Sequence, residues 1–194
     1  QRAAAERARA NLARYFSPNL VEMLADRDEP LGAVRRETVA VLFVDIVGST
    51  DRAVELGDRG WRDLLESHHA LIRRQLDRFG GQEIDTAGDG FVALFDGAAK
   101  AVRAALLMDP SVADLGIQVR VGIHTGEVEV VGGRARGVAV HTAARVASLA
   151  AAGEVLVSGT TCDLLDGSNL ALESRGEHEL KGLSGARPIF AVRR

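Results

Sequence analysis

The sequence predicts a mixed α/β fold, an α/β sandwich of the split βαβ, ferredoxin-like type that follows an N-terminal helical segment. From residue 39 onward, short apolar β-branched runs alternate with segments of helical periodicity. Two of these runs are separated only by the tight turn Gly88-Asp89-Gly90. The alternation favours strands joined by helices, whereas the hairpin argues against a purely parallel, doubly wound sheet.

Residues 1–36 are predicted to form an N-terminal helical segment and a linker, and residues 37–194 the main domain. Apolar residues recur every four positions along one helix face, and Pro18 divides the segment into one piece ending near Tyr15 and another running from Pro18 to about Ala25. Such a seam needs a partner, which is either the domain itself or a second copy of the helix in a dimer. Residues 26–36 form a polar linker.

The domain is predicted to contain strands and helices in alternation. Strands are expected at 39–47, 83–87, 91–95, 118–130, 154–157, 170–173 and 189–192. Helices are expected at 60–79, 98–108, 138–151 and 160–165.

Composition excludes several functions. The chain has 194 residues, with 24 basic and 27 acidic side chains, so no basic surface predicts binding to nucleic acid or to an anionic membrane. The longest apolar run, Val39–Val44, is far shorter than the roughly 20 residues of a membrane span. A single cysteine fits a reducing compartment. We expect a cytoplasmic location, either as a free protein or as the cytosolic part of a longer, membrane-anchored one, because the chain opens without Met.

Two aspartates are the candidate metal-binding residues. Asp45 lies near the end of the first predicted strand, and Asp89 occupies the hairpin turn. If these strands are neighbours, the pair can hold Mg²⁺ or Mn²⁺ against the phosphates of a substrate. Gly48, Ser49 and Thr50 follow the first strand, and their backbone N–H groups are suited to a phosphate. Taken singly, each aspartate has a structural explanation: aspartate is common in tight turns such as that of Asp89, and Asp45 could cap the segment that follows it.

Five blocks, in order, resemble the catalytic domain of class III adenylyl and guanylyl cyclases. They are VLFVDIVGST, TAGDGFVALF, VRVGIHTGEV, GVAVHTAARVASLA and ELKGL. The resemblance runs from about residue 39 to 192 and implies a homodimer with two sites at its interface. It also implies two divalent metal ions, Mg²⁺ or Mn²⁺, and conversion of a nucleoside triphosphate to a 3′,5′-cyclic monophosphate. The preceding helix is similar to the dimerising, signal-transmitting helix of such proteins.

The resemblance also implies roles for individual residues. Asp45 and Asp89 would bind both metals, with help from the Ile46 carbonyl. Arg145 would stabilise charge on the reacting phosphate of the partner subunit's site, and Lys181 would contact the terminal phosphates.

The chain departs from the best-known family pattern at three positions. His141 stands four residues before Arg145, where the family has a transition-state asparagine; an imidazole can also donate a hydrogen bond. Asp85 stands four residues before the hairpin aspartate, where adenylyl cyclases have a base-reading lysine. Arg134, or Arg136 in a gapped alignment, stands where they have its partner aspartate.

Because the charges at these two positions are exchanged, the residues do not decide whether the site reads adenine or guanine. Asp85 could accept from the adenine amino group while Arg134 donates to N1, and the same pair suits guanine at least as well. We expect an adenylyl cyclase that makes cyclic AMP for intracellular signalling, with guanylyl cyclase as the alternative. A catalytically weak regulatory or dimerisation module is a further alternative, because His141 and Asp85 replace functional residues. A diguanylate cyclase or polymerase is disfavoured, since the hairpin lacks the Gly-Gly-Asp-Glu-Phe motif and no basic groove is evident.

Overall fold

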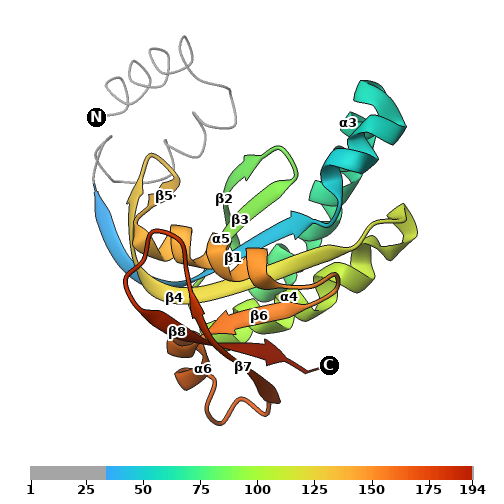
Figure 1. Ribbon diagram of the computed structural model, residues 1–194. Coiled ribbons are helices and arrows are strands. Elements are labelled where there is room, and N and C mark those ends of the chain that lie inside the picture. Colours follow the sequence, from blue (N-terminus) through green and yellow to red (C-terminus); the bar gives the residue numbers. More distant parts are fainter. Residues whose placement is uncertain (1–33, 194) are drawn as a thin grey trace, which may run out of the picture. The chain divides into compact units, whose positions relative to one another are not determined.

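The computed structural model describes residues 34–193, apart from the side chain of Ala87, and these residues contain one eight-stranded sheet (Figure 1). The strand order is β2-β3-β1-β4-β6-β8-β7, and β5 pairs with β4. The strands are β1 (Arg35–Ile46), β2 (Gln82–Ala87), β3 (Gly90–Phe95), β4 (Val119–Val131), β5 (Arg134–Arg136), β6 (Val155–Ser158), β7 (Leu172–Glu179) and β8 (Ala186–Val192). The principal helices are α3 (Ser49–Phe79), α4 (Ala98–Val112), α5 (Val138–Leu149) and α6 (Gly159–Asp163).

The first half of the domain has the predicted split βαβ arrangement. The chain runs β1-α3-β2-β3-α4-β4, and these four strands lie in the order β2-β3-β1-β4. β1 is antiparallel to both of its neighbours, β3 and β4. The hairpin therefore inserts beside β1 instead of extending a parallel sheet, as the turn between the two short strands predicts.

Helices cover both faces of the sheet, which explains why β1 is apolar without interruption from Val39 to Val44. Leu42, Val44 and Ile46 belong to the core that includes α3 and α4. Val39 and Val41, of opposite parity, pack in a second cluster that includes residues of α5. Because side chains alternate along a strand, Asp45 lies on the α5 face.

Several element boundaries differ from the prediction. α3 begins at Ser49 and not near residue 60, and its helix is interrupted at Gly57, where φ is 69° and ψ 172°. β5 was not expected, and β7 continues six residues beyond the predicted strand end at 173. β1 begins at Arg35, inside the predicted linker. The predicted helices within residues 1–25 lie outside the described residues.

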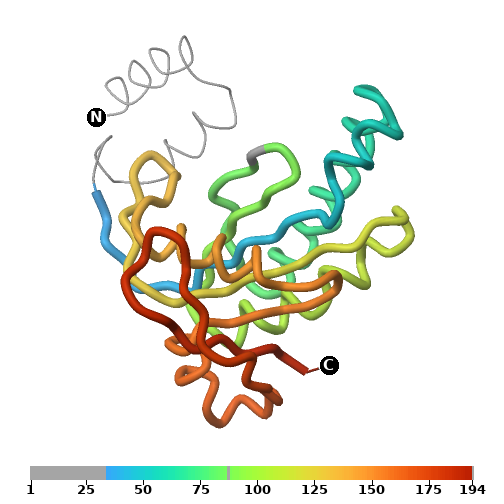
Figure 2. Tube along the Cα trace, viewed as in Figure 1, coloured from blue at the N-terminus to red at the C-terminus, as the bar shows by residue number. Residues whose placement is uncertain are grey.

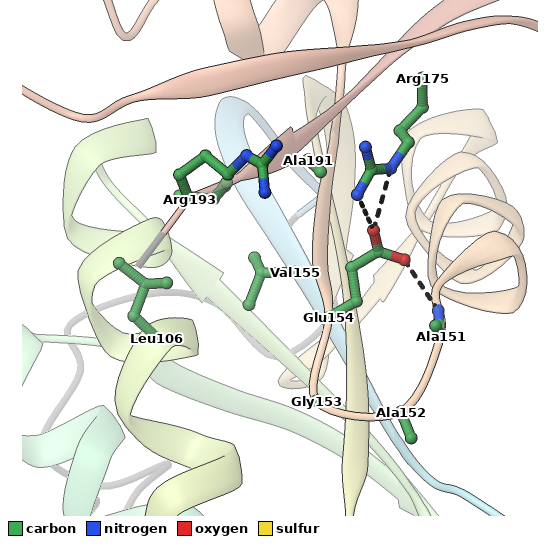
Figure 3. Close-up of a pocket in the computed structure, with 10 residues that line it drawn as sticks. Leu106, Ala151, Ala152, Gly153, Glu154, Val155, Arg175, Ala191 and Arg193 are labelled. Carbon is green, nitrogen blue, oxygen red and sulfur yellow. Dashed lines mark hydrogen bonds and ion pairs between the residues drawn. The ribbon is translucent and has the colours of Figure 1, made fainter.

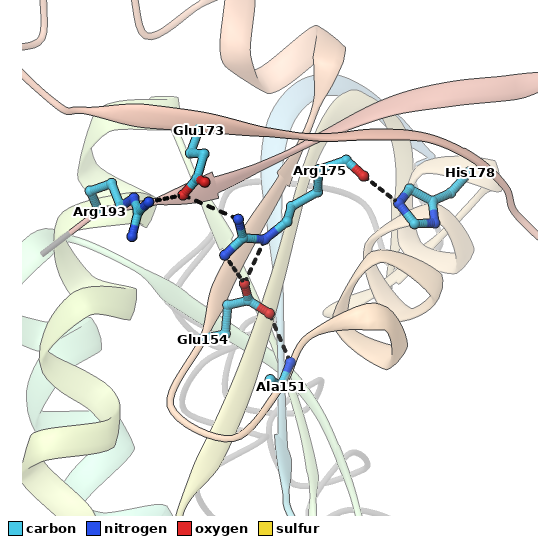
Figure 4. A network of polar contacts seen from close by, with 6 residues as sticks. All are labelled: Ala151, Glu154, Glu173, Arg175, His178 and Arg193. Atoms are coloured by element: carbon cyan, nitrogen blue, oxygen red, sulfur yellow. Dashed lines mark hydrogen bonds and ion pairs between the residues drawn. The ribbon is translucent and has the colours of Figure 1, made fainter.

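The chain ends in a β7–β8 hairpin, which Figure 2 traces in red. A polar network fixes its base (Figure 4). Glu154 accepts hydrogen bonds from the Ala151 N–H at 2.8 Å and from Nη2 of Arg175 at 2.9 Å. Glu173 forms ion pairs with Arg175, at 3.1 Å, and with Arg193. The network links both strands of the hairpin to the loop before β6.

Within residues 34–193, no helix is both long and apolar enough to span a bilayer.

Candidate active site

The two predicted metal carboxylates meet at one edge of the sheet. Asp45 is the penultimate residue of β1, and Asp89 lies in the two-residue turn between β2 and β3. Antiparallel pairing of β1 with β3 sets Val44 opposite Phe91, which brings the turn to the end of β1. Gly88 gives the turn its positive φ of 64°, a conformation that other residues adopt at a cost.

An arginine completes this carboxylate pair. Arg120 of β4 stands opposite Asp45 in the strand register, and its Nη2 and Nε atoms donate to Oδ2 of Asp45 at 2.6 and 3.1 Å. Burial raises the pKa of Asp45 above its ordinary value, the hydrogen bond from Arg120 opposes the rise, and the neighbouring Asp89 adds to it. The two carboxylates are therefore close enough to interact through their charges, and a cation between them would relieve their repulsion.

The donor set fits a divalent metal ion of the Mg²⁺ or Mn²⁺ type. Carboxylate and main-chain carbonyl oxygens are hard ligands, and Mg²⁺ in particular commonly binds through one or two carboxylates plus substrate phosphates. Among residues 34–193 no group of three histidine, cysteine, aspartate or glutamate side chains could form an all-protein cage. Asp45, Asp89 and the Ile46 carbonyl would leave coordination positions open for phosphate oxygens.

The loop after β1 adjoins a cavity of about 310 Å³. Gly48 caps α3 with a left-handed φ of 67°, and its carbonyl accepts the N–H of Arg52 at 3.1 Å. Ser49 and Thr50 form the first turn of the helix. Val47 and Gly48 line the cavity together with the loop that precedes β4. The predicted phosphate-binding residues thus lie next to the carboxylate edge, at a helix N-terminus.

α5 presents His141 and Arg145 one turn apart on its exposed face. The opposite face of the helix packs tightly on β4 at Gly122. A Cβ atom there would lie 2.1 Å from the backbone nitrogen of Ala147 and 2.6 Å from the carbonyl oxygen of Ala143. Only glycine permits this approach, so Gly122 sets the height of His141 and Arg145 above the sheet.

The predicted base-reading residues lie on two strands that contact each other. Asp85 is exposed on β2, Arg134 is exposed on β5, and these strands are in contact. Arg136 is two residues further along β5 and shares a face with Arg134. The structure therefore places the strand of Asp85 in contact with the strand that carries both arginines, and it does not choose between Arg134 and Arg136.

Lys181 is exposed in the turn between β7 and β8. Within residues 34–193, no hydrogen bond or ion pair joins the side chains of Lys181, His141 or Arg145 to either carboxylate. The described residues thus hold one connected group, the two carboxylates with Arg120, and three exposed basic residues that are not bonded to it.

Sequence reasoning missed Arg120. Its signal was an isolated arginine within the apolar run of β4, but only the pairing of β4 with β1 shows that it faces Asp45.

A separate pocket of about 350 Å³ lies between α4, the loop before β6 and the chain end (Figure 3). None of the predicted site residues lines it.

Comparison with known sequences supports the resemblance. A family model described as "Adenylate and Guanylate cyclase catalytic domain" matches residues 31–192. An uncharacterized protein of Mycobacterium tuberculosis H37Rv is 39% identical over 151 residues, which cover 75% of this chain and 52% of that protein. An adenylate cyclase of the same organism is 28% identical over 211 residues, covering 97% of this chain and 47% of that protein. The chain therefore spans about half the length of these relatives, and 17% of a Rhizobium meliloti relative.

Solved structures confirm the predicted mixed α/β fold. The adenylyl cyclase CyaB from P. aeruginosa is 25% identical, with a TM-score of 0.76 covering 84% of this chain and 96% of that one. A guanylate cyclase domain from Catenaria anguillulae, solved in complex with GTP, is 22% identical, with a TM-score of 0.74 covering 82% of this chain and 98% of that one. The chain belongs to the adenylate and guanylate cyclase catalytic domain family.

Proposed function

We propose that this domain is an adenylyl cyclase that converts ATP to 3′,5′-cyclic AMP and pyrophosphate at the interface of a homodimer, for intracellular signalling. The observation that carries the proposal is the approach of Asp45 and Asp89 at the end of β1, beside Arg120. Paired carboxylates next to a glycine-capped helix N-terminus are suited to a metal-bound triphosphate.

Asp45 and Asp89 would hold two divalent ions, together with the carbonyl oxygen of Ile46. When bound, the ions favour ionisation of the ribose 3′-hydroxyl and neutralise the phosphates. The 3′-oxygen forms a bond to the α-phosphorus, and the bond from that phosphorus to the bridging oxygen of pyrophosphate breaks. Gly48, Ser49 and Thr50 would direct backbone N–H groups at a phosphate.

The exposed basic residues suggest that a second subunit completes each site. Arg145 would stabilise the charge that develops on the reacting phosphate, His141 would donate a hydrogen bond next to it, and Lys181 would contact the terminal phosphates. These side chains make no hydrogen bond or ion pair to the carboxylates within the described part of the chain, as expected if they serve the site of a partner copy.

Asp85 and Arg134 are proposed to read the purine. Their strands are in contact, so one subunit can present an acceptor and a donor to the same base. Guanylyl cyclase is the second candidate, because the same pair suits the O6, N1 and N2 pattern of guanine. Arg134→Ala and Asp85→Ala should each raise the KM of the preferred nucleotide about tenfold or more, because a polar partner of the base is lost.

The direct test is product analysis by chromatography. The purified chain is incubated with Mn²⁺ and either ATP or GTP at several protein concentrations. Cyclic AMP formed at a rate that rises faster than linearly with protein would support the proposal. Cyclic GMP as the main product would favour the guanylyl alternative. Absence of both products, even at high protein concentration, would leave the regulatory or dimerisation module as the better account.

Complementation tests the shared site. Asp45→Ala and Arg145→Ala should each lose almost all activity alone, and a mixture of the two should regain part of the wild-type activity because one site of the mixed dimer keeps both intact halves. A mixture that forms dimers but stays inactive would contradict a site built from two subunits.

A further inference from the structure

A histidine without a hydrogen-bond partner among the described residues lies on the buried face of α3. His68 begins a stripe that continues through Ile72 and Leu76, and its side chain is 0% exposed. Both ring nitrogens, Nδ1 and Nε2, are buried without a hydrogen-bond partner among the described residues. A buried polar group left unpaired costs about 1–3 kcal/mol, and native proteins keep few of them.

Ring contacts connect His68 to the hairpin that carries Asp89. The ring of His68 lies 5.4 Å from that of His69, which lies 5.7 Å from the ring of Phe91. Phe91 is the second residue after Asp89, is fully buried, and fixes the start of β3 against β1. His68 therefore lies behind the turn, on the α3 side of the sheet.

The imidazole is held neutral in this position. Burial, and to a smaller extent the neighbouring His69, lower the pKa of His68 to about 4, while the charge of the Asp89 carboxylate opposes the fall. A neutral imidazole has one N–H donor and one acceptor nitrogen. The charge of the Asp89 carboxylate acts on both His68 and His69. His69, whose Nε2 is also buried without a hydrogen-bond partner among the described residues, is only partly buried, and Arg73 and Glu83 act on it as well. Within residues 34–193, Asp89 is the one carboxylate whose charge acts on the fully buried His68, where both ring nitrogens lack a partner.

We propose that His68 is a positioning residue for the metal-bearing turn, and that its ring N–H donates a hydrogen bond to the Asp89 carboxylate when a divalent ion holds that carboxylate. This inference rests on the proposed function, because it assigns a metal to Asp89. Ligating carboxylates are themselves commonly hydrogen-bonded by a second layer of groups, which fix their orientation. The unpaired imidazole then destabilises the metal-free fold, and the hydrogen bond that forms on metal binding offsets this loss.

The test separates metal affinity from stability. Mn²⁺ binding to the full 194-residue chain is measured by electron paramagnetic resonance with inorganic triphosphate present, so that neither turnover nor the choice of base enters. His68→Phe keeps the ring and removes the donor, and we expect its Mn²⁺ Kd to rise about 10- to 100-fold. Its Tm without metal should hold or rise, because the unpaired polar group is gone. His68→Gln restores an N–H donor, and its Kd should return to within about threefold of wild type.

Gln75→Leu is the matched control. Gln75 lies two turns along α3, and its Oε1 is also buried without a partner among residues 34–193. Its replacement should change Tm in the same direction as His68→Phe while leaving the Mn²⁺ Kd unchanged. If His68→Phe does not fold, His68→Leu compared with His68→Gln gives the same contrast.

Two results would overturn the inference. An unchanged Kd in His68→Phe, with the wild type binding Mn²⁺, would make His68 a packing residue only and would leave the proposed function intact. A wild type that binds no Mn²⁺ in the presence of triphosphate would overturn both the inference and the two-metal mechanism.

Discussion

Replacing Gly122 by alanine should move α5, and with it the two exposed residues proposed for the site, His141 and Arg145. The added Cβ would lie 2.1 Å from the backbone nitrogen of Ala147, whereas ordinary contact is 3.4–4 Å. The obstacle is helix backbone and not the end of a flexible side chain, so no rotamer change can relieve it. α5 must therefore withdraw by about 1 Å or more, to restore van der Waals contact.

The displacement predicts two measurable effects. Overpacking of this kind costs about 1–3 kcal/mol of the free energy of unfolding, measured by urea denaturation. A misplacement of about 1 Å in catalytic groups can lower kcat about 100-fold, and His141 and Arg145 are both mounted on α5. The catalytic loss should therefore exceed what the fraction of unfolded protein explains.

Gly97→Ala is the matched control. Gly97 precedes α4, its φ is −157°, and a Cβ there meets nothing within 4 Å. Because Gly97 is the N-cap of α4, where glycine is preferred to alanine, the free energy of unfolding of this variant should fall by no more than about 1 kcal/mol. If Gly122→Ala matched Gly97→Ala in both stability and kcat, the claim that this glycine sets the position of α5 would be refuted.

Other perturbations follow from the same geometry. Arg120→Met removes the hydrogen bond that holds the pKa of Asp45 down, so this pKa should rise further and the acid limb of the pH–rate profile should move to higher pH. Arg145→Ala should lower kcat about 10²- to 10³-fold with little change in KM in steady-state assays, because its charge is needed mainly in the transition state. The folded state holds His68 neutral down to about pH 4, whereas the unfolded chain protonates it below about 6.5. Above pH 6.5 the titration of His68 should take nothing from the free energy of unfolding, and as the pH drops to 4 it should lower that free energy by at most about 3 kcal/mol. Urea titrations at several pH values should show a smaller fall for His68→Phe.

The sequence was sufficient for features that depend on local pattern. The Gly-Asp-Gly turn identifies the β2–β3 hairpin because few other residues favour a two-residue turn. Alternation of strand and helix then predicts the split βαβ order, and with it the meeting of Asp45 and Asp89. The family resemblance added His141, Arg145 and Lys181, for which no local pattern predicts a role.

Features that depend on pairing between distant strands were beyond sequence reasoning. Arg120 and Asp45 are 75 residues apart, and only the register of β1 with β4 sets them opposite each other. β5 contains three residues, two of them arginines, and exists because it pairs with the end of β4. The early start of α3 was also missed, because Gly57 interrupts its periodicity and its first two turns bury no side chain.

The basic residues proposed for the site differ from Arg120 in how their charge is satisfied. Arg120 is half-buried and is satisfied by Asp45, so it can remain in the folded domain at little cost. Arg145 and Lys181 are exposed and make no ion pair within residues 34–193, so water solvates them until an anion arrives. An arginine already committed to a carboxylate would have to exchange that partner for a phosphate. The exposed Lys181, which is proposed to contact the terminal phosphates, needs no such exchange, so we expect Lys181, more than Arg120, to supply the charge that discriminates triphosphate from diphosphate substrates.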